Sequence, residues 1–327
     1  MDTAAIEPLR LSYSSLGTFA GCARKFEFDK LYAAYRNRES GYAAEVGKAL
    51  HAGYQRFLID GDEEQAIFEF LLAFPYELEF EQENDYRSFE ASLMTLEAMM
   101  EANNLGEYEL ARIKHPNGSV VPAIEVPFEI TLLGITVPHR VLDSYGQRTG
   151  EIVERQVSII GYIDALMFHK VTGAYKTLDI KTNRDTVKDA TAKYKFDAQQ
   201  VPYGMVLSQI SEGQIEQFGV LYLDCFVDLL EPRIRDYEFT KTAEDIQEWC
   251  VNKMLDVGRL RQMMAMDFFP RTEHGCMFYR SPCRHLDYCD SRDHQAITNF
   301  RLMGMEAVDD KEPFEPWISI AIEVGNA

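Results

Sequence analysis

The chain has 327 residues, of which 46% are hydrophobic and 26% are charged. This composition is ordinary for a globular protein and excludes a disordered, collagen-like or low-complexity chain. No apolar stretch approaches the roughly 18 residues of a membrane span, and the N-terminus does not resemble a secretory signal. We therefore expect a cytoplasmic protein that does not enter a membrane.

The net charge of −20 would disfavour nucleic-acid binding if it were spread evenly over the chain. It is not spread evenly, because 15 acidic residues and a single base, Arg87, lie between Asp60 and Glu109. The net charge therefore says little about any local site. We interpret residues 60–110 as an acidic helical insertion with a solvated face.

The N-terminal third is predicted to be helical. Ser14 can cap a first helix that runs through Phe19 and Phe26 to Leu31. The spacing of apolar residues predicts further helices over 43–59, 63–74 and 86–102.

The rest of the chain alternates between strand and helix patterns. We expect strands at 121–130, 134–143, 156–168, 174–181, 215–227 and 233–240. Helices are expected at 196–210 and 243–264, and the tail from Phe268 shows little regular pattern. No repeat or linker is evident, so we expect one α/β domain over residues 1–327.

A predicted hairpin over residues 161–182 brings charged side chains together. A four-residue loop at 170–173 would pair His169 with Ala174. Asp164 would then lie directly opposite Asp179 on the neighbouring strand, with the two Cβ atoms about 5 Å apart. Lys181 would share their face of the sheet.

This arrangement favours a cation site. Two carboxylates at that distance repel each other unless a cation neutralises them, and hard oxygen ligands suit Mg²⁺ or Mn²⁺. The alternative is a salt-bridge cluster on an exposed face. The flanking apolar residues Ile163, Ala165 and Leu178 indicate buried strands, where unpaired charges are costly.

Four motifs occur in a familiar order along the chain. Gly47 and His51 precede the hairpin, Gly161 and Asp164 begin it, L-D-I-K-T follows, and Gln199 and Tyr203 come after it. Over about residues 11–290, the order and intervals resemble the PD-(D/E)XK nuclease superfamily, specifically its RecB-like branch. The resemblance implies a restriction-endonuclease-like mixed sheet flanked by helices.

The resemblance also implies roles for individual residues. Asp164, Asp179, His51 and the carbonyl of Ile180 resemble the ligands of Mg²⁺ or Mn²⁺, and Lys181 resembles the catalytic lysine. Gln199 and Tyr203 would position that lysine and the phosphate backbone, although Pro202 lies between them and can break the helix. Glu125 lies where relatives often have an acidic strand residue, and an exposed strand carboxylate is the alternative.

The cysteines suggest a second metal site. Cys276, Cys283 and Cys289 are clustered and Cys22 lies far upstream, which in a cytosolic chain favours a metal over disulfides. Their arrangement resembles that of iron–sulfur nucleases such as the AddB nuclease domain, the CRISPR adaptation nucleases and a group of phage exonucleases. The resemblance implies a [4Fe–4S] cluster that joins Cys22 to residues 268–290, with zinc or unligated thiols as alternatives.

Basic residues flank these cysteines and can contact phosphates or be ordinary solvated charges: Arg24, Lys25, Lys30, Arg280 and Arg284.

The resemblance implies a metal-dependent DNA nuclease, an exonuclease that processes free ends for recombination, repair or phage replication. The sequence contains no Walker A motif, so we expect no fused helicase motor. A non-catalytic module that binds DNA ends or a partner protein is the alternative. A trimming factor that acts with an integrase is a third hypothesis. The sequence is compatible with a recombination, helicase or integrase partner and with self-association.

Overall fold

The computed structural model describes residues 7–31, 41–77, 87–102, 106–142, 148–183, 191–211, 217–227, 231–272, 276–278, 281–283, 285–286, 289 and 314–323. These residues group into two compact units. The first unit comprises Met1–Arg38, Phe128–Gly161 and Cys250–Ala327, and the second comprises Glu39–Pro127 and Tyr162–Trp249. A single nuclease domain over 1–327 stays a prediction.

The second unit contains a mixed sheet. Its strands pair in the order β2-β6-β7-β8-β9, where β7 and β8 are parallel and the other pairs are antiparallel. The strands are β2 (Tyr108–Leu110), β6 (Arg148–His169, from Tyr162 onward), β7 (Tyr175–Asn183), β8 (Gln217–Phe226) and β9 (Arg233–Thr242). A separate small ladder pairs β3 (Arg112–Lys114) with β4 (Val120–Pro122).

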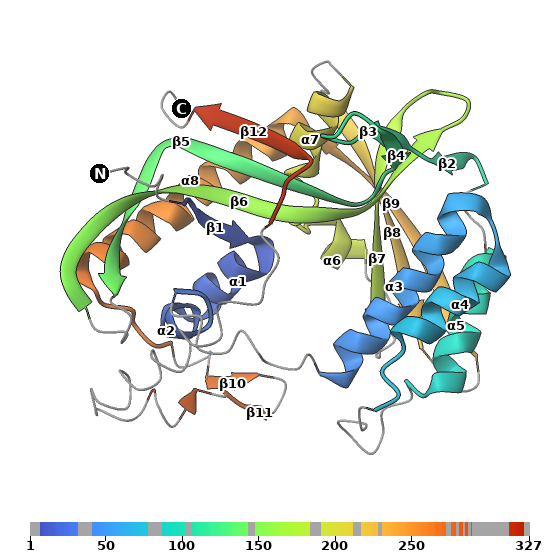
Figure 1. The fold of residues 1–327 in the computed structure, drawn as a ribbon, viewed down its shortest axis with the longest axis horizontal. Coiled ribbons are helices and arrows are strands. Elements are labelled where there is room, and N and C mark those ends of the chain that lie inside the picture. Colours follow the sequence, from blue (N-terminus) through green and yellow to red (C-terminus); the bar gives the residue numbers. More distant parts are fainter. Residues whose placement is uncertain are drawn as a thin grey trace. The chain divides into compact units, whose positions relative to one another are not determined.

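Helices cover both faces of this sheet (Figure 1). Leu178, Leu221 and Leu223 pack in one apolar core with three helices, which are α3 (Tyr42–Asp60), α4 (Glu63–Ala73) and α5 (Phe89–Ala102). Successive strand residues point to opposite faces. Tyr222 accordingly points the other way and stacks on Tyr194 of α6 (Thr191–Lys195), which precedes α7 (Tyr203–Ile210).

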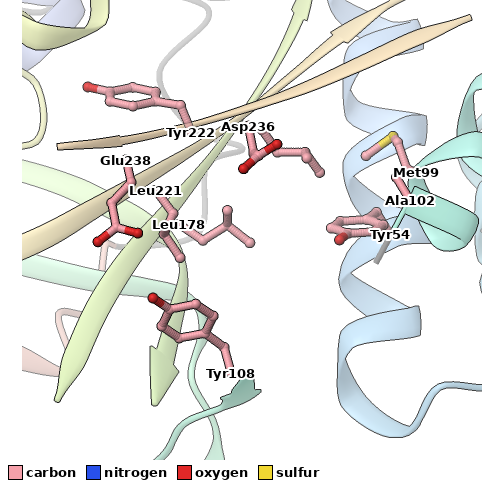
Figure 2. Close-up of a pocket in the computed structure, with 10 residues that line it drawn as sticks. Tyr54, Met99, Ala102, Tyr108, Leu178, Leu221, Tyr222, Asp236 and Glu238 are labelled. Atoms are coloured by element: carbon pink, nitrogen blue, oxygen red, sulfur yellow. The ribbon is translucent and has the colours of Figure 1, made fainter. Parts of the chain in front are cut away.

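A cavity of about 60 Å³ lies in this unit (Figure 2). Tyr54 of α3 and Met99 of α5 line it opposite Leu178 of β7, and Glu238 of β9 contributes a carboxylate. None of the predicted site residues lines this cavity. It is therefore a feature of the core packing and lies outside the candidate site.

The first unit contains the remaining part of the long strands β5 (Ile124–Leu142) and β6. Strand β1 (Leu9–Ser12) pairs with β6 in parallel, and β12 (Ile318–Glu323) pairs with β5 in parallel. A Cβ atom on Gly161 would lie 2.7 Å from the Phe128 ring. The glycine of the G-x-x-D motif is thus required for close packing.

The N-terminal helices of this unit are short. They are α1 (Tyr13–Gly21), α2 (Ala23–Phe26) and the π-helical segment η1 (Glu27–Leu31). The long helix α8 (Ala243–Met266) enters the unit at Cys250, and β10 (Met277–Phe278) pairs with β11 (Ser281–Pro282). Within the described part of the chain, no helix has both the length and the apolar character needed to cross a membrane.

The predicted α/β class and the mixed sheet flanked by helices are confirmed. The predicted helices at 43–59, 63–74 and 243–264 match α3, α4 and α8 within two residues. The helix predicted over 86–102 matches α5 from Phe89 onward. Arg87 and Ser88 are not helical, and Tyr86 lies outside the described residues.

Several predicted boundaries are wrong. The first helix is interrupted at Cys22, whose φ of −158° is extended, and its cap is Ser12, which accepts a hydrogen bond from the Ser15 N–H. From Ile124 to Leu142, the strands predicted at 121–130 and 134–143 form the single strand β5, which passes through Gly134 at a φ of +77°. The start of the first predicted strand lies in β4. Strands β1 and β12 were not predicted.

The helix predicted over 196–210 begins only at Tyr203, with Pro202 as its N-cap. Proline is well tolerated at a helix start because it has no N–H to leave unpaired.

Candidate metal and catalytic site

The hairpin of β6 and β7 has the predicted register. Ala165 pairs with Leu178 and Phe168 pairs with Tyr175. The turn is closed by a hydrogen bond from the Gly173 N–H to the His169 carbonyl, and Gly173 takes a φ of +71°, which glycine adopts without strain. The register places Asp164 opposite Asp179, on the face that carries Lys181.

The two strands separate where the acidic residues begin. Backbone pairing ends at Ala165 and Leu178, and beyond it the carboxylate of Asp164 accepts a hydrogen bond from the Ile180 N–H at 2.9 Å. The carbonyl of Ile180 lies 2.9 Å from Nε2 of His51. Side chains thus satisfy both polar groups of Ile180 that the strand partner leaves open.

Helix α3 places three residues in a row toward this strand end. Gly47, His51 and Gln55 are spaced by four and therefore share one helix face. A Cβ atom on Gly47 would lie 3.0 Å from Oγ1 of Thr182 on β7, so glycine permits the close approach. Gln55 donates a hydrogen bond from Nε2 to Oε1 of Glu125 at 2.6 Å.

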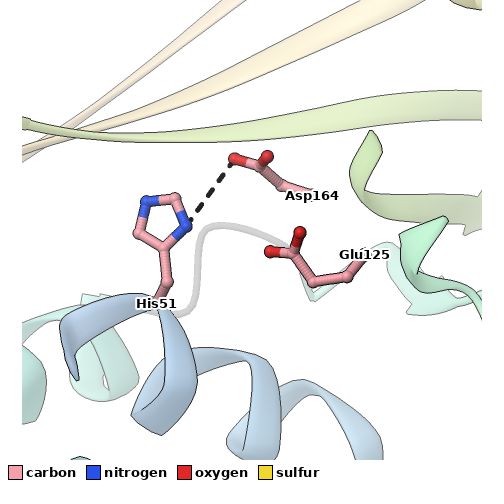
Figure 3. A group of neighbouring side chains, drawn as sticks. All are labelled: His51, Glu125 and Asp164. Atoms are coloured by element: carbon pink, nitrogen blue, oxygen red, sulfur yellow. Dashed lines mark ion pairs between the residues drawn. The ribbon is translucent and has the colours of Figure 1, made fainter. Parts of the chain in front are cut away.

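His51, Glu125 and Asp164 form a group of potential metal ligands. One donor atom from each residue lies within 4.8 Å of the others, and the side chains point toward one another in Figure 3. His51 and Glu125 also line an open hollow of about 460 Å³. Glu125 takes a φ of +46°, a left-handed backbone that is rare outside glycine and that costs free energy.

The electrostatics of this group fit a divalent cation. Burial lowers the pKa of His51, so the imidazole is neutral, and burial raises the pKa of Asp164. Glu125 is exposed as a whole residue, and the partial desolvation of its carboxyl group raises its pKa. If Nε2 donates its proton to Ile180, Nδ1 presents a lone pair to Oδ2 of Asp164 at 3.9 Å. Two acceptors that face each other at this distance are stabilised by a cation between them.

The distance of 3.9 Å between Nδ1 of His51 and Oδ2 of Asp164 also suits two ligands of one Mg²⁺ ion. Ligands of Mg²⁺ at about 2.1 Å lie between about 3.0 and 4.2 Å from each other.

Lys181 lies beside Asp179 on β7. Its Nζ is 2.7 Å from Oδ2 of Asp179 and donates a hydrogen bond to Oε1 of Gln199 at 3.2 Å. Burial raises the pKa of Asp179 to about 6, and the adjacent lysine acts in the opposite direction. The pKa of Lys181 is raised because the nearby carboxylates outweigh its burial. The amine is therefore charged at neutral pH.

Gln199 and Tyr203 both reach this region although no helix joins them. Tyr203 begins α7 and donates its hydroxyl hydrogen bond to the carbonyl of Tyr162 at 2.9 Å. Burial and the charges of Asp179 and Asp164 raise its pKa well above the ordinary value. A non-helical turn before Pro202 thus brings Gln199 to Lys181, where a helical turn was expected.

Sequence analysis missed Asp197. Its Oδ1 accepts a hydrogen bond from the Gln199 N–H at 2.8 Å, and its charge acts on both Asp179 and Lys181. The available signal was an aspartate two residues before Gln199, which is the spacing of an Asx turn. Gln55 was also missed, because a glutamine one turn after a histidine has no distinctive spacing.

The predicted residues therefore form two adjoining groups. His51, Asp164 and the auxiliary Glu125 form the potential ligand group, and Asp179, Lys181 and Gln199 form the other. The carbonyl of Ile180 contacts His51, and its role as a metal ligand stays a prediction.

The four predicted cluster cysteines lie in the first unit. Cys22, Cys276, Cys283 and Cys289 line one cavity together with Arg24 and Arg271. Burial alone would raise the pKa of the Cys22 thiol, but hydrogen bonds from the backbone of Lys25, Thr272 and Arg24 outweigh it and lower the pKa. This environment favours a thiolate, the form that binds metals.

A buried pair accompanies these cysteines. Nε2 of His285 lies 2.6 Å from Oδ1 of Asp29 in η1, and His285 is only 1% exposed. Residues Arg280 and Arg284 lie outside the described part of the chain. The other two cysteines differ in environment, since Cys225 is fully buried in the sheet and Cys250 is half-buried on α8.

Comparison with known proteins identifies the family. The family model of the PD-(D/E)XK nuclease superfamily matches residues 10–292. The chain belongs to this superfamily. Its members use divalent metals, and the ligand group of this PD-(D/E)XK protein agrees with that chemistry. No curated protein matches the chain.

Two solved structures resemble this PD-(D/E)XK protein more distantly. A candidate exonuclease from Eubacterium rectale is 14% identical, with 86% of this chain and 94% of that chain covered and a TM-score of 0.43. The structure of SSO0001 is 13% identical, with 74% and 85% covered and a TM-score of 0.25.

Proposed function

We propose that this chain is a Mg²⁺- or Mn²⁺-dependent deoxyribonuclease of the RecB-like branch. It hydrolyses phosphodiester bonds at DNA ends, as an exonuclease in recombination, repair or phage replication. The observation that carries the proposal is that the Lys181–Asp179 pair adjoins the ligand group of His51, Glu125 and Asp164. A module that only binds DNA has no need of this complete set.

The residues divide the chemistry between them. His51, Asp164, Glu125 and Asp179 would hold the metal ion, which would supply water activation and polarisation of the scissile phosphate. Lys181 is charged and held by Gln199, so its amine stabilises negative charge that develops on the phosphate oxygens. Gln55 holds Glu125 in its left-handed conformation and so orients that carboxylate.

The ionised form of the acids is the active one. Burial favours the protonated carboxyl at Asp164, Glu125 and Asp179, and a divalent cation reverses this preference because it favours the carboxylate. Metal binding therefore releases protons, and it strengthens as pH rises.

The cysteine cavity is proposed to hold a [4Fe–4S] cluster. Its support is that Cys22, Cys276, Cys283 and Cys289 line one cavity and that the Cys22 thiol has a lowered pKa. Four thiolates are the ligand set of such a cluster, and zinc with four thiolates is the alternative that metal analysis distinguishes. The cluster would join the N-terminal helices to the cysteine segment and stabilise both.

The test of the nuclease is a cleavage assay on end-labelled single-stranded and double-stranded DNA and on a closed circle, with Mg²⁺ or Mn²⁺. We expect stepwise shortening of the linear substrates and no cleavage of the closed circle. Cleavage of the circle would replace the exonuclease with an endonuclease. DNA binding without cleavage under all metal conditions would instead support the non-catalytic module that binds DNA ends.

A further inference from the structure

An exposed aromatic ring lies beside the candidate site. Phe196 directly follows α6, and 78% of its surface is exposed. Single exposed apolar residues are common and need no explanation by themselves. Here the backbone on both sides of the ring is anchored, and two exposed lysines precede it.

The anchors lie on both sides of Phe196. Tyr194 is fully buried and stacks on Tyr222 of β8 with the ring centres 4.5 Å apart. Lys241 of β9 donates a hydrogen bond to the Lys195 carbonyl at 2.6 Å, and Asp197 accepts the Gln199 N–H. The segment is therefore fixed to the sheet by its neighbours, and Phe196 contributes little to that attachment.

Two of the exposed residues before the ring are lysines. Lys193 and Lys195 are both exposed, and Nζ of Lys195 lies 5.9 Å from the centre of the Phe196 ring. An aromatic face combined with flanking ammonium groups is the chemistry that binds unpaired nucleic-acid strands. Bases stack on the ring, and the cations neutralise phosphates.

Phe196 is also close in sequence to residues that act on the candidate site. The next residue, Asp197, acts electrostatically on Asp179 and Lys181, and its turn sets the position of Gln199. A base that stacks on Phe196 would accordingly hold its strand near the Lys181 amine. A base inside a duplex is already stacked on both faces and cannot offer one to the ring.

We propose that Phe196, flanked by Lys193 and Lys195, is a stacking platform for an unpaired base, so that the site takes single-stranded DNA ends. This inference deepens the proposed nuclease function and rests on it. It names the substrate class and assigns Phe196 to substrate binding.

The test measures binding by the full-length protein without divalent metal, so that no cleavage occurs. A labelled oligothymidylate and a duplex of equal length are compared by fluorescence anisotropy. We expect Phe196→Ala to weaken binding of the single strand by about 5- to 100-fold and to leave duplex binding unchanged. Phe196→Trp should retain binding, and the introduced indole should be quenched by the oligonucleotide.

The matched control is Val171→Ala, because Val171 is 84% exposed at the tip of the hairpin and has no proposed role. It should bind both DNAs like the unmodified protein. Unchanged binding of the single strand by Phe196→Ala, or an equal loss on duplex, would overturn the platform while leaving the nuclease intact if DNA is still cleaved. An unmodified protein that neither binds nor cleaves DNA would overturn the nuclease itself.

Discussion

Asp197 holds Gln199 through a hydrogen bond of 2.8 Å from the Gln199 N–H to its carboxylate. The side chain of Gln199 in turn accepts a hydrogen bond from Lys181, whose amine pairs with Asp179. The direction of the lysine amine thus depends on a turn that lies outside the D-x-K strand. Asp197 is a positioning residue, and its contribution can be separated into shape and charge.

Asp197→Asn and Asp197→Ala make this separation. Asparagine keeps an oxygen that can accept the Gln199 N–H, so we expect its kcat to stay within about threefold of the unmodified value. Alanine loses the turn, and we expect kcat to fall about tenfold, the equivalent of one hydrogen bond, with KM little changed. Steady-state kinetics on end-labelled DNA check this. Equal losses in both variants would show that charge, not turn geometry, is what Asp197 contributes.

Lys181→Ala and Asp179→Ala should reduce cleavage by at least about 100-fold while DNA binding survives. Lys181 stabilises charge that develops during reaction, and Asp179 is a proposed ligand of the metal that activates water, so both losses affect the transition state more than the bound substrate. Gel cleavage and anisotropy on the same preparations measure the two effects. Lys170→Ala is the control, since Lys170 is an exposed lysine in the hairpin turn. Undiminished cleavage by either site variant would contradict the assignment.

Asp179→Asn should stabilise the metal-free protein at neutral pH while it abolishes cleavage. The pKa of Asp179 is about 6 in the folded chain, raised chiefly by burial from an ordinary value of 3.8. Between these values the folded state binds more protons than the unfolded state, so the free energy of unfolding falls as pH rises.

We expect the asparagine variant to gain about 1–3 kcal/mol at pH 7–8 and nothing near pH 4, measured by urea unfolding. Cleavage by the unmodified protein should rise with pH through about 6, because the carboxylate is the form that binds metal. A variant that is less stable at pH 8 would contradict this account.

Cleavage should require Mg²⁺ or Mn²⁺, stop in EDTA and be poorly supported by Ca²⁺, whose loose geometry activates water less well. Glu125→Gln replaces one anionic carboxylate of the ligand group with a neutral amide and should weaken Mn²⁺ binding by about 10- to 100-fold in calorimetry. Glu90→Gln, on the exposed face of α5, should leave metal binding unchanged. Robust cleavage in EDTA would exclude metal-dependent hydrolysis.

Cys22→Ser should lose iron and lower the melting temperature. Anaerobically purified protein is expected to be brown, with about four irons per chain by metal analysis. Each ligand bond adds to folding stability, because the unfolded chain has no preformed site. Cys250→Ser is the control and should keep both iron and stability, since Cys250 lies outside the cavity. Stoichiometric zinc in place of iron would support a metal that joins Cys22 to the other three cysteines, but it would contradict the [4Fe–4S] cluster.

The hairpin could be predicted from sequence because its register depends only on one turn length and the alternation of strand residues. Glu125 was assigned only as an auxiliary residue, since its place in the ligand group depends on a left-handed backbone that no local pattern reveals. Asp197 was missed because it acts through Gln199, and no motif records an indirect contact. The break before α7 had a visible cause in Pro202, whereas the π-helical η1 had none.

The alternation of strand residues also constrains where this protein can change in length. One residue inserted into β7 would turn Asp179 and Lys181 toward the apolar core and turn Leu178 and Ile180 out of it. An insertion in the turn at 170–173 leaves the alternation within both strands unchanged, and Val171 extends from this turn into solvent. Natural insertions, and any label or tag introduced by design, should therefore be accepted in this turn and rejected in the strands that it joins.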